Sequence, residues 1–595
     1  MIELLLPAGD ELSLRAAIAN GADAIYFGTG RFNARRKAKN FSSPEKVISY
    51  CHKHNVKAYL AINTLIKNNE LSQVLGIIRK TKTDAFIIQD PCLIPLIRKH
   101  SDSQIHISTQ ATITATQGIP KGADRVILPR ELTLEEIKAF SSHVETEVFV
   151  HGALCISYSG QCLFSSMVGG RSGNRGLCAQ PCRKKYNNKY TLSTKDLCLL
   201  EKLPEIIDSG VTSLKVEGRL RNHKYVGTVA RIYRKYIDQY YNNSFKIEQK
   251  DLDDLKLAFN REFTKGFMFE KTITNPKNPS NQGLYLGKTK DNRLRLRHEL
   301  NPGDGITIKT DETKGFKFKE KKKKGEIITI DATDYTPVYM TSSHKIIDLS
   351  EPIPEQVPKK IPEKEITFKK VPNTDKPRLF CRVNDKKNFN KSKQADIIYV
   401  PLELYQDAIK LHDKVYIQTP RIVSTKEAEE IRSQINNLQP KGILVSNRAF
   451  LDLPFKKHID YNLNCYNDID INCYNSKDAI PVISPELNKK ELKELRNKNV
   501  IVLAHEDLIL MTTKEPLKAP ELIDQENRHF RVSGMNILNN KPLGLFDHIN
   551  ELIETGIKYF LVDPRQLTTY RDIIEQKAKL TKKGYTTGHF NRGVY

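Results

Sequence analysis

The stretch ADRVILPRELTLEEIKAF, residues 123–140, holds one complete unit of the pattern that decides the fold. Its largely apolar run 125–129 has the length and composition of a parallel strand that is buried on both faces. The amphipathic segment 134–142 follows after a short turn and predicts a helix. A strand followed at once by a helix is the repeating unit of parallel α/β folds.

The same unit recurs through the first 245 residues. Short, largely apolar runs predict eight strands, at 2–7, 24–28, 56–63, 85–89, 105–109, 125–129, 147–151 and 213–217. Amphipathic, helix-like segments lie between them. Eight strand-then-helix units in this length predict a (β/α)8 barrel of the TIM type. An open, doubly wound sheet is the alternative fold.

The loop that follows the seventh predicted strand concentrates cysteine. Residues 151–186 read HGALCISYSGQCLFSSMVGGRSGNRGLCAQPCRKKY, with the spacing C-x6-C-x15-C-x3-C. Four thiols in a glycine-rich loop without apolar periodicity predict a site that wraps a metal ion or cluster. The long gaps differ from the knuckles of zinc ribbons and favour an iron–sulfur cluster; zinc, free thiols and disulfides are the alternatives. The predicted ligands are Cys155, Cys162, Cys178 and Cys182.

Active sites of such barrels lie at the C-terminal ends of the strands, so the residues that follow each strand are candidates for chemistry. Lys215, Glu217 and Arg219 alternate at the end of the eighth strand and share one side of it. Glu217 is the predicted general base, Arg219 the predicted clamp for a carboxylate or phosphate, and His151 a predicted acid or base. An internal ion pair and a structural histidine are the alternative interpretations. The candidate substrate-binding residues are Lys215, Arg130, Gln110 and Arg36.

Beyond residue 245 the pattern changes. We predict the first barrel at 1–245, a linker at 246–282 and a small β-barrel-like domain at 283–350, where short strands surround a Pro-Gly-Asp-Gly turn. A second linker, rich in Pro, Lys and Glu, covers 351–376. Residues 377–595 again hold eight candidate strands, at 379–383, 396–401, 415–419, 442–447, 460–465, 479–484, 500–505 and 559–563.

This last part repeats the first barrel. AIPVISPELNKKELKEL at 479–495 parallels residues 123–140, and VIVLAHEDLILMTTKEP at 500–516 parallels the strand that enters the cysteine loop. Ile509 and Pro516 stand where the first copy has Cys155 and Cys162. We therefore predict a second, degenerate (β/α)8-like barrel that cannot build the same metal site. A chance likeness of two β/α runs is the alternative.

The net charge and the N-terminal sequence indicate which partners the protein can have. The 595 residues include 95 Lys and Arg against 70 Asp and Glu, a net charge of +25. Such an excess predicts a nucleic-acid partner, RNA first, with a lysine-rich solvated surface as the alternative. No run approaches 18 apolar residues, and the N-terminus lacks the basic start of a signal peptide. We therefore expect a cytoplasmic protein with no membrane partner, in a compartment where disulfides are rare.

Three segments closely resemble the collagenase-like peptidase family U32: the cysteine string HGALCISYSGQC…LCAQPCR, the opening LLPAGDELSLRAAIANGADAIYFG, and SLKVEGRLRNHKYV. The resemblance is strong over residues 1–270 and looser beyond them. The long, duplicated arrangement is similar to a branch that hydroxylates a cytidine of large-subunit ribosomal RNA. Other relatives hydroxylate a tRNA uridine or the ubiquinone ring without O2.

The resemblance implies a [4Fe-4S] cluster on Cys155, Cys162 and Cys178, with Cys182 as the available fourth ligand. It also implies prephenate as a hydroxyl donor in the RNA branch. Together with the residues, it predicts an iron–sulfur enzyme for O2-independent hydroxylation of a pyrimidine, a 23S rRNA cytidine or a tRNA uridine, with a small anionic co-substrate. Two alternatives stay open: a collagenase-like peptidase, and a non-catalytic RNA-binding factor with a structural zinc ion.

Overall fold

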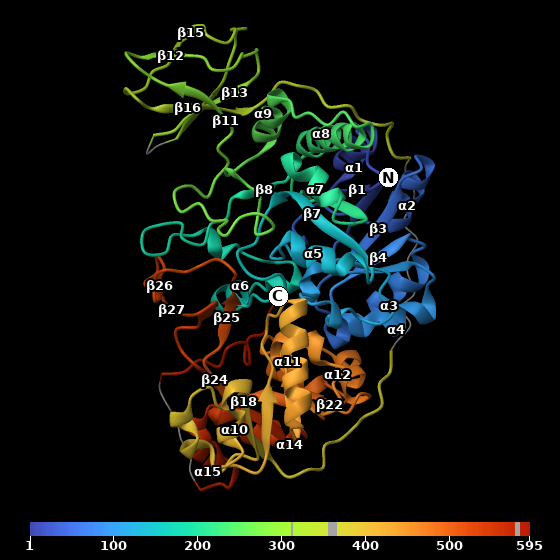
Figure 1. Cartoon of the computed structure of the whole chain (residues 1–595), viewed down its shortest axis with the longest axis vertical. Coiled ribbons are helices and arrows are strands. Elements are labelled where there is room, and N and C mark those ends of the chain that lie inside the picture. The colour runs from blue at the N-terminus through green and yellow to red at the C-terminus, as the bar shows by residue number, and fades with distance from the viewer. Residues whose placement is uncertain (311–312, 355–365, 578–583, 595) are drawn as a thin grey trace.

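The first part of the chain forms a closed parallel barrel in the computed structural model, which describes residues 1–310, 313–354, 366–577 and 584–594 (Figure 1). Neighbouring strands pair in chain order, and the last strand pairs with both the first and the seventh, which closes the ring. The predicted (β/α)8 barrel is confirmed. Its strands are β1 (Glu3–Pro7), β2 (Ala24–Phe27), β3 (Lys57–Ile62), β4 (Ala85–Ile88), β5 (Gln104–Ile107), β6 (Arg125–Ile127), β7 (Glu145–Ala153) and β9 (Ser213–Val216).

Helices surround this barrel because each carries one apolar face that must be buried against the strands. Local capping fixes where several of them begin. Asp10 accepts a hydrogen bond from the Ser13 N–H at 2.9 Å, and Thr133 forms a capping box with Glu136. The helices are α1 (Glu11–Ala19), α2 (Pro44–Lys53), α3 (Leu71–Lys80), α4 (Ile94–His100), α5 (Leu134–Ser141), α7 (Leu203–Ile207) and α8 (His223–Tyr241).

Two short strands extend the sheet outside the ring, and the sequence did not predict them. β8 (Asp196–Cys198) runs antiparallel to β7, and β10 (Phe263–Thr264) pairs with β8. β10 and helix α9 (Gln249–Ala258) both lie in the segment 246–282, which the sequence analysis treated as a linker. This segment is ordered because α9 packs on α8, where the Tyr236 hydroxyl donates to Asp251 at 3.0 Å.

A small β domain follows, with its own apolar cluster that includes Leu286, Leu294 and Ile306. One sheet has the order β11-β16-β13-β14, and β12 pairs with β15. Residues 355–365 of the predicted linker 351–376 lie outside the described part of the chain. The strands are β11 (Leu284–Lys288), β12 (Arg293–Arg295), β13 (Gly305–Ile308), β14 (Lys314–Lys317), β15 (Ile327–Thr329) and β16 (Pro337–Ser342).

The last part of the chain forms a second parallel barrel that is nearly closed. Its strand order is β22-β21-β20-β19-β18-β17-β30-β23, and a single bridge between Val482 and Ile501 spans the remaining gap. The predicted duplication of the barrel is confirmed. The strands are β17 (Arg378–Arg382), β18 (Ile397–Pro401), β19 (Val415–Gln418), β20 (Gly442–Val445), β21 (Lys456–Ile459), β22 (Ala479–Pro481), β23 (Ile501–Leu503) and β30 (Tyr559–Val562).

The fifth strand of the second barrel was predicted in the wrong place. The sequence suggested 460–465, but β21 covers Lys456–Ile459 and residues 461–463 form a 3₁₀ turn. Asp460 starts that turn by accepting a hydrogen bond from the Tyr461 N–H at 2.9 Å. The helices of this barrel are α10 (Tyr405–Ala408), α11 (Thr425–Leu438), α12 (Asp468–Asn475), α13 (Lys489–Glu494), α14 (Ile549–Glu554) and α15 (Leu567–Ile574).

Each barrel carries an insertion after its seventh strand, and the two insertions contact each other. In the second barrel the insertion contains β24 (His505–Glu506), the sheet β25 (Ile509–Thr512), β28 (Asn536–Leu538), β27 (His529–Ser533) and β26 (Glu521–Ile523), and β29 (Leu543–Gly544). In the first barrel it is the cysteine loop with helix α6 (Phe164–Gly169), which lies beside β25 in Figure 1. The two barrels therefore meet through the C-terminal ends of their strands.

Among the helices of the described residues, none combines the length and the apolar composition that crossing a bilayer requires.

Candidate active site

The four cysteines of the loop lie close enough together for their charges to act on one another. Cys155 and Cys178 are exposed, whereas Cys162 and Cys182 are half-buried. Burial raises the pKa of the Cys162 and Cys182 thiols, and the charge of the nearby Cys178 raises the pKa of these two thiols and of Cys155 further. All ten cysteines lie in the described part of the chain and are free thiols, so the disulfide alternative has no support here.

Backbone N–H groups point at the sulfur atoms of this loop. The Gln180 N–H donates to the Sγ of Cys178 at 3.3 Å. The N–H of Ser157 donates to Cys155, and that of Phe164 donates to Cys162. Such bonds favour the thiolate and are one of the means by which proteins tune iron–sulfur clusters.

The insertion of the second barrel holds the loop in place. The N–H groups of Tyr158 and Leu163 donate to the carbonyls of Thr512 and Leu510 at 2.8 and 2.7 Å. The backbones of Cys162 and Met511 also pair as an isolated antiparallel β-bridge. One apolar cluster joins the loop residues Ile156, Leu163, Phe164, Met167 and Tyr186 to the interior of the second barrel. The second barrel is therefore part of the support of the four-cysteine site.

The loop also packs against the segment that follows β2. Gly176 has a φ of +76°, and a Cβ atom there would lie 2.2 Å from the carbonyl oxygen of Asn33. Beside it, the guanidinium of Arg175 makes two hydrogen bonds to the carboxylate of Glu70, at 2.8 and 2.7 Å. Glycine is required at 176 for this close approach.

Glu217 lies at the mouth of the barrel and is paired with Arg35. The guanidinium of Arg35 lies 3.0 Å from its carboxylate. Burial raises the pKa of Glu217, but Arg35, Arg130 and Arg219 outweigh it, and the net pKa is lowered. A carboxylate of lowered pKa is a weak base at neutral pH, so this geometry suits an anchor for arginines better than the predicted general base. From the segment 33–37 the sequence analysis selected Arg36, whereas the structure pairs Arg35 with Glu217.

Arg219 is a buried guanidinium with neutral partners. It donates to the side-chain oxygens of Asn33 and Asn40, at 2.7 and 2.5 Å. Its Nε is buried and has no hydrogen-bond partner. Burial lowers its pKa to about 10, so the side chain stays cationic at neutral pH. A Cβ at Gly28 would lie 2.5 Å from this guanidinium, which explains the glycine at the end of β2.

Two other candidates occupy structural positions. Lys215 pairs with Glu147 at 2.6 Å inside the barrel, where both side chains are buried. His151 packs against the rings of Tyr225, Tyr233 and Phe263, and burial lowers the pKa of its ring to about 4. These surroundings match the alternative interpretations, an internal ion pair and a neutral structural histidine. Roles for Lys215 in substrate binding and for His151 in proton transfer stay predictions.

The remaining candidate substrate-binding residues are Arg130, Gln110 and Arg36, and they lie in three different surroundings. Arg130 donates to the carbonyl of Ala153 at 2.6 Å, and its charge acts on both Glu217 and Cys155. Gln110 lines a cavity between the two barrels that has about 10 Å³ of free space, room for about one water molecule. Arg36 lies beside Gly176, near Arg175. The structure thus brings Arg130 to the site and places Gln110 at the barrel interface.

Glu131 is a buried carboxyl whose charge acts on the thiol of Cys155. It is 2% exposed and follows β6, directly after Arg130. Burial raises its pKa to about 7, although Arg130 and Lys514 act against this shift. A carboxyl with this pKa can hold or release a proton near neutral pH. Its position at the end of a barrel strand was the available signal.

The raised pKa of Glu131 predicts a pH-dependent stability. The folded protein keeps this proton up to about pH 7, whereas the unfolded chain loses it near 4.5. Stability is therefore lost as the pH rises through this window, by about 3 kcal/mol. We expect Glu131→Gln to raise the Tm of metal-free protein relative to the wild type at about pH 8 more than at about pH 5. An equal Tm difference at both pH values would contradict the shift.

The fold defines a double β/α-barrel protein whose first barrel carries the loop with four cysteines. The chain belongs to peptidase family U32, whose model matches residues 9–277. "Uncharacterized protease MJ0090" of Methanocaldococcus jannaschii is 38% identical over 301 residues, 45% of this chain and 73% of that protein. "tRNA hydroxylation protein P1" of Bacillus subtilis is 33% identical over 45% of this chain and 71% of its own length.

A third relative, which is longer, also has a name from RNA hydroxylation. "23S rRNA 5-hydroxycytidine C2501 synthase" of Escherichia coli is 36% identical over 258 residues, which are 40% of this chain and 39% of that protein. These names include a protease and two RNA-hydroxylation proteins. The predicted membership of family U32 is confirmed.

Proposed function

We propose that this chain is an enzyme that hydroxylates a pyrimidine of ribosomal or transfer RNA and that its four-cysteine site holds an iron–sulfur cluster. Two relatives that share about a third of their aligned residues with this chain carry names from RNA hydroxylation. The observation that supports the proposal is the grouping of the four loop thiols, whose charges act on one another.

The thiols fit a cluster better than a single zinc ion. Four sulfurs around tetrahedral zinc would lie about 3.8 Å apart, given Zn–S bonds of about 2.3 Å. Among the described residues, no three of these sulfur atoms lie within 4.8 Å of one another. A wider group of soft thiolates with N–H donors suits an iron–sulfur cluster on Cys155, Cys162, Cys178 and Cys182. When bound, such a cluster would supply one-electron redox chemistry.

The chain's own residues would bind the co-substrate and handle protons. Arg35, Arg130 and Arg219 place three positive charges around Glu217. One carboxylate balances them only in part, which favours a small anionic co-substrate at this mouth. The carboxyl of Glu131, whose pKa lies near 7, would hold or release a proton there. The described residues give no feature that selects prephenate over another small dianion.

RNA would be held by the positive charge of the molecule. The chain carries a net charge of +25. Exposed lysines gather on the small β domain, around β14 and the segment after it: Lys314, Lys317, Lys319, Lys321, Lys323 and Lys324. Lysines of this kind contact the phosphate backbone without reading sequence, and such binding weakens as salt is added.

Mass spectrometry of the RNA tests the proposed function. Ribosomal and transfer RNA from a strain lacking this chain should lose a hydroxylated pyrimidine that a plasmid copy restores. Unchanged nucleosides in both RNA pools would refute the proposal.

A peptidase is the second candidate, because the family and one relative carry that name. Metal-free protein that cleaves gelatin, and stops when a single cysteine is replaced, would favour it. A colourless protein with one tightly held zinc ion on the four cysteines would instead favour the RNA-binding factor without catalysis.

A further inference from the structure

A second group of metal-ligand side chains lies away from the cysteine loop, where the two barrels meet. Asp90 and Cys92 follow β4 of the first barrel, at the 3₁₀ turn η2 (Pro91–Leu93). Asp470 lies on α12 of the second barrel. One ligand atom of each of these three residues lies within 4.8 Å of those of the other two. Neither barrel alone provides this group.

A fourth ligand is close by. Cys473, one helical turn after Asp470 on α12, shares a hydrogen bond with Cys92. Residues three apart on a helix lie on the same face, so Asp470 and Cys473 both face the first barrel. The four side chains offer two thiols and two carboxyl groups, as many ligands as a tetrahedral ion takes. Three of them, Asp90, Cys92 and Asp470, already bring their ligand atoms together, and Cys473 adjoins the group through Cys92.

The carboxylate of Asp470 is incompletely satisfied. The residue is 2% exposed. Its Oδ2 accepts hydrogen bonds from the N–H groups of Tyr466 and Asn467 at 2.6 and 3.2 Å, but its buried Oδ1 has no hydrogen-bond partner. A buried, unpartnered carboxylate oxygen beside a second carboxyl is costly unless a cation or a proton joins them.

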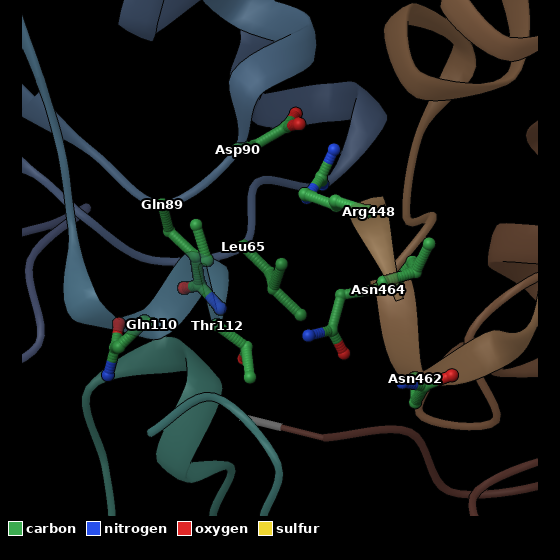
Figure 2. A pocket seen from close by; sticks show the side chains of 10 residues that line it. Leu65, Gln89, Asp90, Gln110, Thr112, Arg448, Asn462 and Asn464 are labelled. Carbon is green, nitrogen blue, oxygen red and sulfur yellow. The ribbon is translucent and has the colours of Figure 1, made fainter. Parts of the chain in front are cut away.

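The surrounding charges suit a divalent ion. Two thiolates and two carboxylates around a divalent ion leave a net charge of −2. The charges of Cys92, Asp90 and Cys473 act on Arg448, and the charge of Lys477 acts on Cys473, so both cations lie near the group. These two cations would balance the site. Figure 2 shows Asp90 and Arg448 at the same end of the cavity between the barrels.

We infer that Asp90, Cys92, Asp470 and Cys473 bind one divalent transition-metal ion, zinc by its chemistry, and that this ion fastens the two barrels together. Two thiolates disfavour calcium and magnesium, which take oxygen ligands. The site is separate from the four-cysteine loop and does not depend on the proposed RNA chemistry.

Metal analysis of the whole chain tests this inference. Protein purified without chelators and dialysed against a zinc buffer should hold one zinc ion per chain, besides any iron. The double variant Cys92→Ser/Cys473→Ser should lose the zinc and keep the iron, whereas Cys155→Ala/Cys162→Ala should lose the iron and keep the zinc. Cys198→Ser, a half-buried thiol elsewhere, is the matched control and should keep both.

Single variants guard against failure of the double variant to fold. Cys473 is half-buried, so Cys473→Ser should fold and bind zinc more than about 10-fold more weakly in a competition with a chelating dye, since loss of even an outer hydrogen-bond partner costs that much. Zinc content that is the same in Cys473→Ser, Asp470→Asn and the wild type would overturn the inference. A wild type without zinc, or one with a Cys92–Cys473 disulfide by mass spectrometry, would also overturn it.

Discussion

Replacing Cys155 or Cys178 with alanine is expected to remove both the iron and the hydroxylated nucleoside. The thiolates are the proposed ligands of the cluster, and the loss of a direct ligand should exceed the 10- to 100-fold cost of losing an outer partner. We therefore expect iron content and hydroxylation to fall by more than about 100-fold. Iron analysis of anaerobically purified protein and nucleoside mass spectrometry of complemented cells provide the two measurements.

Cys198→Ser is the control for this experiment, because that cysteine lies on β8 outside the loop. It should retain iron and activity. Cys182→Ala then decides the fourth ligand: a loss equal to that of Cys155→Ala assigns it to the cluster, and a smaller loss points to another ligand. Full iron content in Cys155→Ala would show that the loop does not hold the cluster.

Phe530→Ala in the second barrel is expected to destabilise the cysteine loop of the first. Phe530 is 1% exposed, and its ring centre lies 4.9 Å from that of Phe164 and 6.3 Å from that of Tyr186. Removing a buried phenylalanine costs about 3–5 kcal/mol. Because the lost contacts belong to the loop, we expect faster cleavage of the loop by protease and faster loss of iron to a chelator.

Phe316→Ala is the matched control, since Phe316 is 42% exposed on the small β domain. It should change neither rate. If Phe530→Ala lowers the Tm of the second barrel but leaves the rate of iron loss unchanged, the second barrel does not support the site.

The fold was largely predictable because buried parallel strands leave a clear apolar pattern. The pattern failed at β21, where Lys456 and Lys457 open a strand of only four residues and the more apolar stretch after it forms a turn. A strand whose first residues are polar and face solvent is not detected by a search for apolar runs.

The site was predictable only where its residues are neighbours in the sequence. Spacing revealed the four cysteines, but the pair of Arg35 with Glu217 joins the second strand to the eighth and leaves no local signal. Alternation placed Lys215 on the inner side, yet its partner Glu147 lies on another strand. The group of Asp90, Cys92 and Asp470 spans both barrels, so only the assembled structure reveals it.

The contact between the two insertions has a consequence for how this gene can change. The second insertion no longer carries thiols, but it covers the apolar side of the loop that does, through Phe530 and the strand β25. Cutting the gene between the halves would leave Ile156, Leu163 and Phe164 without that cover and invite aggregation. We therefore expect the cysteine loop to keep its fold only when both halves belong to the same chain.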